Sequence, residues 1–210
     1  MSVKSGGLVL RYTFPERGPV SATVTINHAA DKLSLMSPVM GREEFMSNTQ
    51  EGVFWLPDKQ TDVFIAMQNT SPQSRRVTPT LFITGRQVLL NEITLAPQET
   101  SFLNLNEILG NTAANTSAAI RLVNDGNPGD VIAEGGLVNH AKGFSKRISF
   151  MDTSLHFYDM TLRANFLFLG QPPSELGFPS QVSFRAVCAM RNTSTGKVRV
   201  HPVVKYLDAG

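Results

Sequence analysis

The sequence predicts an all-β protein made of tandem antiparallel sandwich units. Short segments that alternate apolar and polar residues recur along the 210 residues, separated by residues that favour turns. The hexapeptide AMQNTS at Ala66–Ser71 returns as AMRNTS at Ala189–Ser194, with strand-like sequence on both sides. A motif repeated at this distance indicates two units of roughly 100 residues each. We therefore expect a first sandwich at residues 1–112 and a second at residues 113–210.

The strands expected in the first unit follow one another closely. The clearest is Val20–Ile26, where apolar residues alternate with Ser and Thr, the period of a strand with one buried face. Similar runs predict strands at Leu8–Tyr12, Val63–Met67, Val77–Ile83, Val88–Leu95 and Phe102–Leu105. Asn106–Leu109 can form one helical turn, which Gly110 would end. Strands at this spacing are typical of a sandwich or a barrel.

The second unit repeats the order of the first at two offsets. Asn27–Ala29 recurs as Asn139–Ala141, an offset of 139 − 27 = 112, whereas Asn69 recurs as Asn192, an offset of 192 − 69 = 123. The second copy therefore contains 123 − 112 = 11 additional residues between these landmarks. Loops accept insertions of this size at little cost in free energy.

Glycine and proline mark special positions in the repeated strands. Matching Val20 to Val131 by strand phase gives an offset of 111, and Gly135-Gly136 stands where one extra residue would have to be absorbed. We therefore expect a β-bulge at this glycine pair. Pro79 and Pro202 correspond to each other, and we expect both at a sheet edge or a bulge, because proline cannot donate to a ladder.

The second unit is shorter than the first at its end. After Ile83 the first unit continues through two more strand-like runs, whereas the second ends soon after Tyr206. The second sandwich is thus expected to lack its last hairpin and to have an open edge, which folded proteins normally cover. Three explanations remain: the chain comes from a longer array, another molecule supplies the strands, or an N-terminal segment fills the gap. Self-association through the edge after Tyr206 follows from the second explanation.

Several short runs carry a resemblance to a known family. They are Gly7–Tyr12, Asn127–Ala133, Asn139–Ser145, Leu95–Thr100 and the paired Asn-Thr-Ser strand ends. In their order they resemble tandem immunoglobulin-like β-sandwich repeats of large exported or cell-surface bacterial proteins, most of them of unknown function. The resemblance implies two tandem immunoglobulin-like antiparallel units, a non-catalytic module, and a secreted or cell-surface location. The first unit departs from the pattern at Asp31–Ser34, which replaces the Gly-Phe-Ser run.

Composition excludes some partners. Charged residues make up 17% of the chain, the formal net charge is +2, and the basic residues are scattered, so we expect no nucleic-acid partner. No window approaches the run of about 18 apolar residues that a membrane helix needs. Met1–Gly7 lacks the apolar core of a signal peptide, so this chain contains no leader and a cytoplasmic location stays open.

Matched positions in the two copies predict which side chains are buried. Cys188 corresponds to Ile65, since 188 − 123 = 65, and a cysteine that replaces an aliphatic residue is typical of a core position. We expect this thiol to be buried and inert. By the same alternation, Met67 and Met190 are both expected to point inward.

The sequence predicts no enzyme activity, no cofactor and no metal site. His156 and Asp159 lie three residues apart, but no third ligand stands at a known spacing from them. The chain contains no nucleophile elbow, phosphate-binding loop or dinucleotide fingerprint.

The function expected from these observations is that of a structural or adhesive interaction module, with a protein or polysaccharide partner at the cell surface. One alternative is a carbohydrate-binding module, for which Trp55, Tyr158 and His156 are the candidate ligand contacts. The other is a strand-exchange assembly protein, comparable to a pilus chaperone or a donor-strand subunit.

Overall fold

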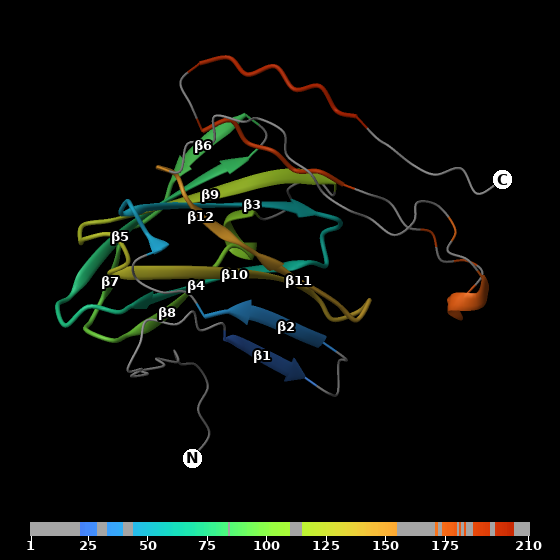
Figure 1. Ribbon diagram of the computed structural model, residues 1–210, viewed down its shortest axis with the longest axis horizontal. Coiled ribbons are helices and arrows are strands. Elements are labelled where there is room, and N and C mark those ends of the chain that lie inside the picture. Colours follow the sequence, from blue (N-terminus) through green and yellow to red (C-terminus); the bar gives the residue numbers. More distant parts are fainter. Residues whose placement is uncertain are drawn as a thin grey trace, which may run out of the picture.

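The computed structural model describes residues 22–28, 33–39, 44–83, 85–109, 115–154, 171, 174–179, 181, 183, 187–193 and 196–203. Nearly all regular structure in these residues is β-strand, and all of their strand pairings are antiparallel. Two sheets pack face to face as a sandwich (Figure 1). The prediction of an all-β sandwich is confirmed.

The larger sheet, here called the large sheet, has the order β12-β3-β9-β5-β6, and β7 pairs with β5 beside β6. Its strands are β3 (Thr49–Leu56), β5 (Arg75–Ile83), β6 (Arg86–Leu89), β7 (Ile93–Leu95), β9 (Thr116–Asn124) and β12 (Phe150–Asp152).

The smaller sheet, here called the small sheet, has the order β11-β10-β4-β8. Its strands are β4 (Asp62–Asn69), β8 (Thr100–Asn104), β10 (Val131–Asn139) and β11 (Phe144–Ile148). A separate hairpin of β1 (Thr23–His28) and β2 (Leu33–Pro38) lies beside β11. The helical turn α1 (Asn106–Leu109) follows β8 as predicted, and the short 3-10 helix η2 (Ser174–Leu176) lies far along the chain.

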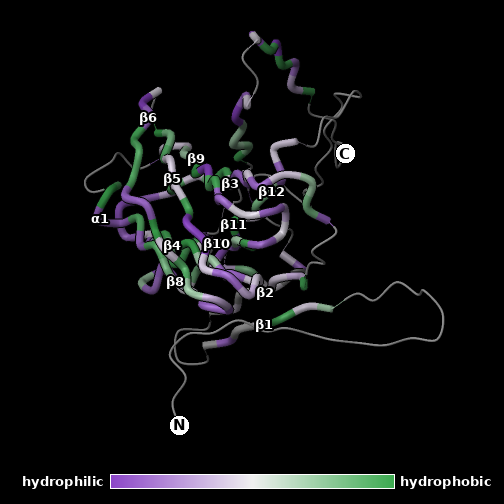
Figure 2. The backbone as a smooth tube through the Cα atoms, turned by 90° about the vertical axis from the view of Figure 1, so that its left-hand side faces the viewer, coloured by the Kyte–Doolittle hydropathy of each residue, from purple (hydrophilic) through white to green (hydrophobic). Residues whose placement is uncertain are grey.

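Alternation along the strands supplies the core between the sheets. On β4 the buried residues Val63, Ile65 and Met67 alternate with more exposed ones, and they face Ile120 and Leu122 of β9 across the interior. Hydrophobic segments occur on strands of both sheets (Figure 2). Burial of these aliphatic side chains is the main source of the stability of the sandwich.

A buried glutamine joins the two sheets. The side-chain amide of Gln50 on β3 donates to the carbonyl of Val131 at 2.7 Å and accepts from the backbone N–H of Ala133 at 3.3 Å. Strand β11 pairs only with Gly135–Asn139 of β10, so it does not reach these backbone groups. Gln50 satisfies polar groups whose burial without a partner would cost about 1–3 kcal/mol each.

The described strands do not divide at residue 112. Strand β9 lies between β3 and β5, and β10 pairs along its length with β4, so strands from both predicted units share each sheet. The boundary expected between residues 1–112 and 113–210 therefore does not separate two sandwiches. The repeat identifies equivalent strands, but it does not specify which copy of a strand pairs with which.

The β-bulge predicted at Gly135-Gly136 is absent, since both neighbouring ladders continue through the pair without an extra residue. The glycines are needed because the opposite strand packs closely. A Cβ on Gly136 would lie 2.4 Å from the ring of Phe64, and one on Gly135 would lie 2.8 Å from Cδ1 of Ile65.

The region predicted as one strand at Val88–Leu95 forms two, β6 and β7, with an interruption between them. Pro79 lies opposite this interruption, and its carbonyl accepts from the N–H of Leu90 at 3.0 Å. Because the N and C=O of one strand residue point to the same side, the proline nitrogen faces the interruption instead of β9. Pro79 does not lie at a sheet edge, one of the two expected places; it lies on the interior strand β5, opposite this interruption of the ladder. The strand predicted at Leu8–Tyr12 lies outside the described residues.

The second copy of the hexapeptide is not built into a sheet. The described residues 187–193 and 196–203, here called the C-terminal segment, contain no strand. Met67 is fully buried as predicted, but Met190 is 53% exposed and Cys188 is also exposed, so the inward positions predicted for these two are wrong. The physical reason is that β4 already occupies the pairing edge of β10 that this copy would need.

Hydrogen bonds to Asp152 connect the end of β12 to Met46 and Ser47, which precede β3. Its buried carboxylate accepts hydrogen bonds from the backbone N–H groups of Met46, Ser47 and Ser154 at 2.6–2.8 Å, and from both serine hydroxyls. Burial by itself would raise the pKa of Asp152, but the hydrogen bonds from Ser154 and Ser47 outweigh it and hold the pKa far below its ordinary value.

We expect the free energy of unfolding to fall as the pH decreases below about 4, because the unfolded Asp152 carboxyl, with a pKa of about 3.9, takes up its proton before the folded one does. The contribution of Asp152 to the free energy of unfolding is complete above the pKa of the unfolded carboxyl and is lost progressively as the pH falls toward the pKa of the folded one. Asp152→Asn should lower stability at neutral pH and flatten the decline between about pH 5 and pH 2, as measured by urea denaturation. Glu107→Gln, on exposed α1, is the control; an equal change in slope for both variants would contradict the role of Asp152.

The first copy of the Asn-Thr-Ser motif joins three loops. The amide of buried Asn69 donates to the carbonyls of Gln73, Leu95 and Ala96 at 2.7–3.2 Å, and its oxygen accepts from the N–H and hydroxyl of Ser71. In the second copy, Asn192 makes the equivalent donation to the carbonyl four residues ahead, that of Gly196, at 2.6 Å.

We expect Asn69→Ala to lower the free energy of unfolding by about 2–4 kcal/mol, because it removes the donor to the buried carbonyl of Leu95 and to the part-buried carbonyls of Gln73 and Ala96. The matched variant Asn192→Ala, at an exposed position of the same motif, should cost less than about 1 kcal/mol. Urea denaturation followed by circular dichroism measures both. Equal losses would show that the motif acts only as a local turn.

Candidate functional site

The outer face of the large sheet, which points away from the small sheet, carries charged and aromatic side chains. Glu51 of β3 is opposite Arg121 of β9, and Phe82 of β5 is opposite Ala119. Because side chains alternate along a strand, these residues point away from the core residue Ile120. The sheet thus brings together residues from distant parts of the sequence.

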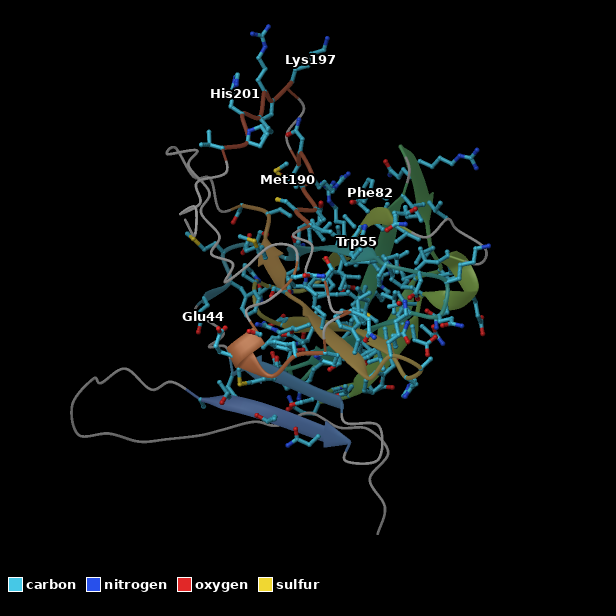
Figure 3. The ribbon with its side chains drawn as sticks, turned by 90° about the vertical axis from the view of Figure 1, so that its right-hand side faces the viewer. Glu44, Trp55, Phe82, Met190, Lys197 and His201 are labelled. Carbon is cyan, nitrogen blue, oxygen red and sulfur yellow. The ribbon has the colours of Figure 1, made fainter. Side chains whose placement is uncertain are left out.

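Arg191, from the second copy of the hexapeptide, completes this group. Its guanidinium carbon lies 3.4 Å from the centroid of the Phe82 ring, and its Nε donates to one carboxylate oxygen of Glu51. Nε of Arg121 donates to the other oxygen at 2.9 Å, and its guanidinium carbon lies 5.4 Å from the same ring. Glu51, Phe82, Arg121 and Arg191 are here called the outer-face cluster. Phe82 and Trp55 lie on the side of the sandwich that faces the C-terminal segment, on which Met190 is labelled (Figure 3).

The electrostatics of the cluster favour holding an extended chain against the sheet. The side chain of Glu51 is only 4% exposed, and a carboxylate removed from water needs a close positive partner. Two guanidinium groups supply that charge, and Arg191 also covers the face of the Phe82 ring, a contact that the flat guanidinium makes well. One side chain therefore anchors the C-terminal segment to two strands, β3 and β5.

The two copies of the hexapeptide differ at the anchoring position. Arg191 corresponds to Gln68 of β4, since 191 − 123 = 68. Gln68 is part of the β4 ladders with β10 and β8, whereas Arg191 reaches the outer face of the large sheet. The repeated turn is kept in both copies, while the residue before it gives the second copy a different contact.

Of the residues predicted as ligand contacts, the structure describes Trp55. It lies on β3, two residues beyond Val53 and four beyond Glu51, so it shares the outer face with the cluster and is half-buried. His156 and Tyr158 lie outside the described residues, as does Tyr206 at the predicted open edge. Sequence reasoning missed the cluster itself.

No helix in the described residues is both long and apolar enough to cross a membrane. Within the same residues, no group of three or more His, Cys, Asp or Glu side chains is placed to hold a metal ion.

No family model matches the chain, and no curated protein matches it. Among solved structures, the crystal structure of Thermotoga maritima 1070 aligns with 50% of this chain and 89% of its own, at 12% sequence identity and a TM-score of 0.38. A likeness of this size supports no conclusion about fold or function.

We expect Arg191→Ala to lower the free energy of unfolding by about 1–3 kcal/mol, because it removes one partner of a buried carboxylate and uncovers an aromatic ring. Amide hydrogen exchange in the C-terminal segment should also become faster. Arg191→Lys should recover only part of the loss, since an ammonium cannot stack on Phe82 as a guanidinium does.

Arg199→Ala is the matched control, because Arg199 is an exposed arginine of the same segment. It should change stability by no more than about 0.5 kcal/mol. If Arg191→Ala had no larger effect than this control, the cluster would not be an anchor.

Proposed function

We propose that this protein is a non-catalytic structural module that builds a larger assembly through its C-terminal segment. The observation that carries the proposal is the contrast within that segment. Arg191 anchors it to the outer face of the large sheet, while its apolar side chains face solvent. The exposed fractions range from 51% to 75% for Met190, Val198, Val200 and Val203.

The sequence of the segment suits strand addition. Val198 and Val200 alternate with Arg199 and His201, the pattern of a strand that buries one face. An extended chain with exposed apolar side chains can bind a partner by adding to a sheet edge. Such a chain, held by Arg191, is available to a partner without prior unfolding of the sandwich.

The proposed setting is a secreted or cell-surface assembly, in which the module has a structural or adhesive role. This setting is supported by the resemblance to tandem immunoglobulin-like repeats. A protein partner suits the segment better than a polysaccharide, because its exposed apolar residues are aliphatic and not aromatic.

Carbohydrate binding is the second candidate, and the observation that favours it is that Trp55 shares the outer face with Phe82. Sugar rings need open aromatic surfaces, however, and Arg191 covers the ring of Phe82. The half-buried Trp55 would then be the main aromatic contact on this face. Strand-mediated assembly is therefore the function that the contacts support better.

We expect the full-length protein to associate in a concentration-dependent way, and Met190→Lys to shift it toward the monomer. A charge at this exposed apolar position would have to be desolvated in any interface that the segment forms. Analytical ultracentrifugation over a range of concentrations measures the association.

Met46→Lys is the matched control, since Met46 is also highly exposed, at 71%, and lies outside the C-terminal segment. It should leave the association unchanged. A wild-type protein that is monomeric at every concentration, or equal effects of both substitutions, would refute the proposed function.

A further inference from the structure

The hairpin of β1 and β2 is the structural counterpart of the hairpin of β10 and β11. In the first, Val24 is opposite Ser37; in the second, Gly135 is opposite Ile148. Both members of the pair are displaced by the same offset, since 24 + 111 = 135 and 37 + 111 = 148. With one offset for both strands of the hairpin, the pairing register requires 111, and β1 then corresponds to β10 residue by residue.

The C-terminal segment contains the counterpart of β4. With the offset of 123, Val187–Met190 corresponds to Phe64–Met67. Strand β10 pairs with β4 over these residues, whereas Val187–Met190 is described without a strand. In the part of the chain that the structure describes, β1 pairs with β2 on one edge and with no strand on the other. Among the described residues, β1 therefore lacks a partner that corresponds to β4, and Val187–Met190 lacks a partner that corresponds to β10.

Side-chain sizes favour Val187–Met190 over β4 as the partner of β1. Gly135 and Gly136 of β10 make room for Ile65 and Phe64, because a Cβ at either glycine would approach these side chains to 2.8 Å or 2.4 Å. At the corresponding positions β1 carries the β-branched residues Val24 and Thr25, since 135 − 111 = 24 and 136 − 111 = 25. In this register the side chains of Val24 and Thr25 would take the space that the ends of the Ile65 and Phe64 side chains fill, so these two side chains would have to shift.

The C-terminal copy compensates for this change in size. Ile65 is replaced by Cys188 and Phe64 by Val187, since 65 + 123 = 188 and 64 + 123 = 187. Small residues lie opposite large ones in the β4–β10 pair, and medium residues would lie opposite medium ones in the pair formed by β1 with Val187–Met190. The total volume of each facing pair is thus similar, as close packing requires.

The two segments lie at opposite ends of the molecule. Ser145 of β11 holds the β1–β2 hairpin beside the small sheet, where its hydroxyl donates to the carbonyl of Ser34 at 2.7 Å. Arg191 holds the C-terminal segment on the outer face of the large sheet. The body of the sandwich lies between them in both views (Figures 1 and 3). In this arrangement β1 cannot reach the C-terminal segment of its own chain.

We propose that β1 of one molecule pairs antiparallel with Val187–Met190 of a second copy of this chain, in the register by which β10 pairs with β4. This inference rests on the proposed function and names the partner of the C-terminal segment. The register sets Val24 opposite Cys188, Thr25 opposite Val187 and Ala22 opposite Met190. Directly opposed residues point to the same face, so Val24 and Ala22 would share one face of the new strand pair with Cys188 and Met190. This pairing would cover the exposed side chain of Met190.

The native cysteine allows a direct test of this pairing. Val24→Cys places a second thiol opposite Cys188, and directly opposed residues of antiparallel strands have Cα atoms about 4.5–5.5 Å apart, within the range of a disulfide. The full-length variant would be oxidised mildly and run on a non-reducing gel, with mass spectrometry to identify the linked peptides. We expect mainly dimers and larger species joined between positions 24 and 188, and their loss on reduction.

Thr25→Cys is the matched control, because a side chain at this position points to the opposite face of β1 and cannot meet Cys188 in the proposed register. It should give no more cross-linked product than the wild type, in which Cys188 is the single cysteine. Circular dichroism would verify that both variants are folded.

The remaining outcomes separate this inference from the proposed function. A disulfide between positions 24 and 188 within one molecule would overturn the second copy as partner. Absence of the link, in a protein that still associates and still responds to Met190→Lys, would overturn the pairing but leave the proposed function standing. A wild-type protein that never associates would overturn both.

Discussion

The antiparallel pairing of β4 with β10 is the contact on which the rest of the molecule depends. It lies at the centre of the small sheet and joins the two copies of the repeat into one sandwich. Val63, Ile65 and Met67 become buried through it, and Gly135-Gly136 allows the strands to approach without collision. Because β10 occupies this place, the hairpin of β1 and β2 and the C-terminal segment are left at opposite ends of the sandwich.

The two copies of the hexapeptide form the same turn in different surroundings. In both copies the asparagine amide donates to the carbonyl four residues ahead, so the turn is specified by neighbouring residues. In the first copy, sheet packing buries Asn69 and adds the carbonyls of Leu95 and Ala96 as partners. In the second copy Asn192 stays exposed. The motif is therefore retained because of its turn, and its contribution to stability depends on the surrounding sheet.

The two copies of the hexapeptide differ at the residue before the turn, and this residue determines what the second copy contacts. Where β4 has Gln68, the C-terminal segment has Arg191, which binds Glu51 and covers Phe82 on the large sheet. Arg191 thus holds the segment while its aliphatic residues Met190, Val198, Val200 and Val203 stay exposed. A strand-like chain that is anchored but not paired is well suited to join one molecule to another, since pairing with a partner would bury surface that the single molecule leaves in water.

The sequence by itself determined the fold class, the strands β1, β4, β5 and β8, the turn of the repeated motif and the helical turn at Asn106–Leu109, because alternation and turn chemistry are local properties. Only the tertiary structure decided that strands from both halves share one sandwich, that Cys188 and Met190 are exposed, and that Gly135-Gly136 serves close packing. It also assembled the outer-face cluster, whose members lie far apart in the chain and have no common motif. Pairing between equivalent strands depends on which side chains fit opposite each other, and this is settled when the two sheets pack.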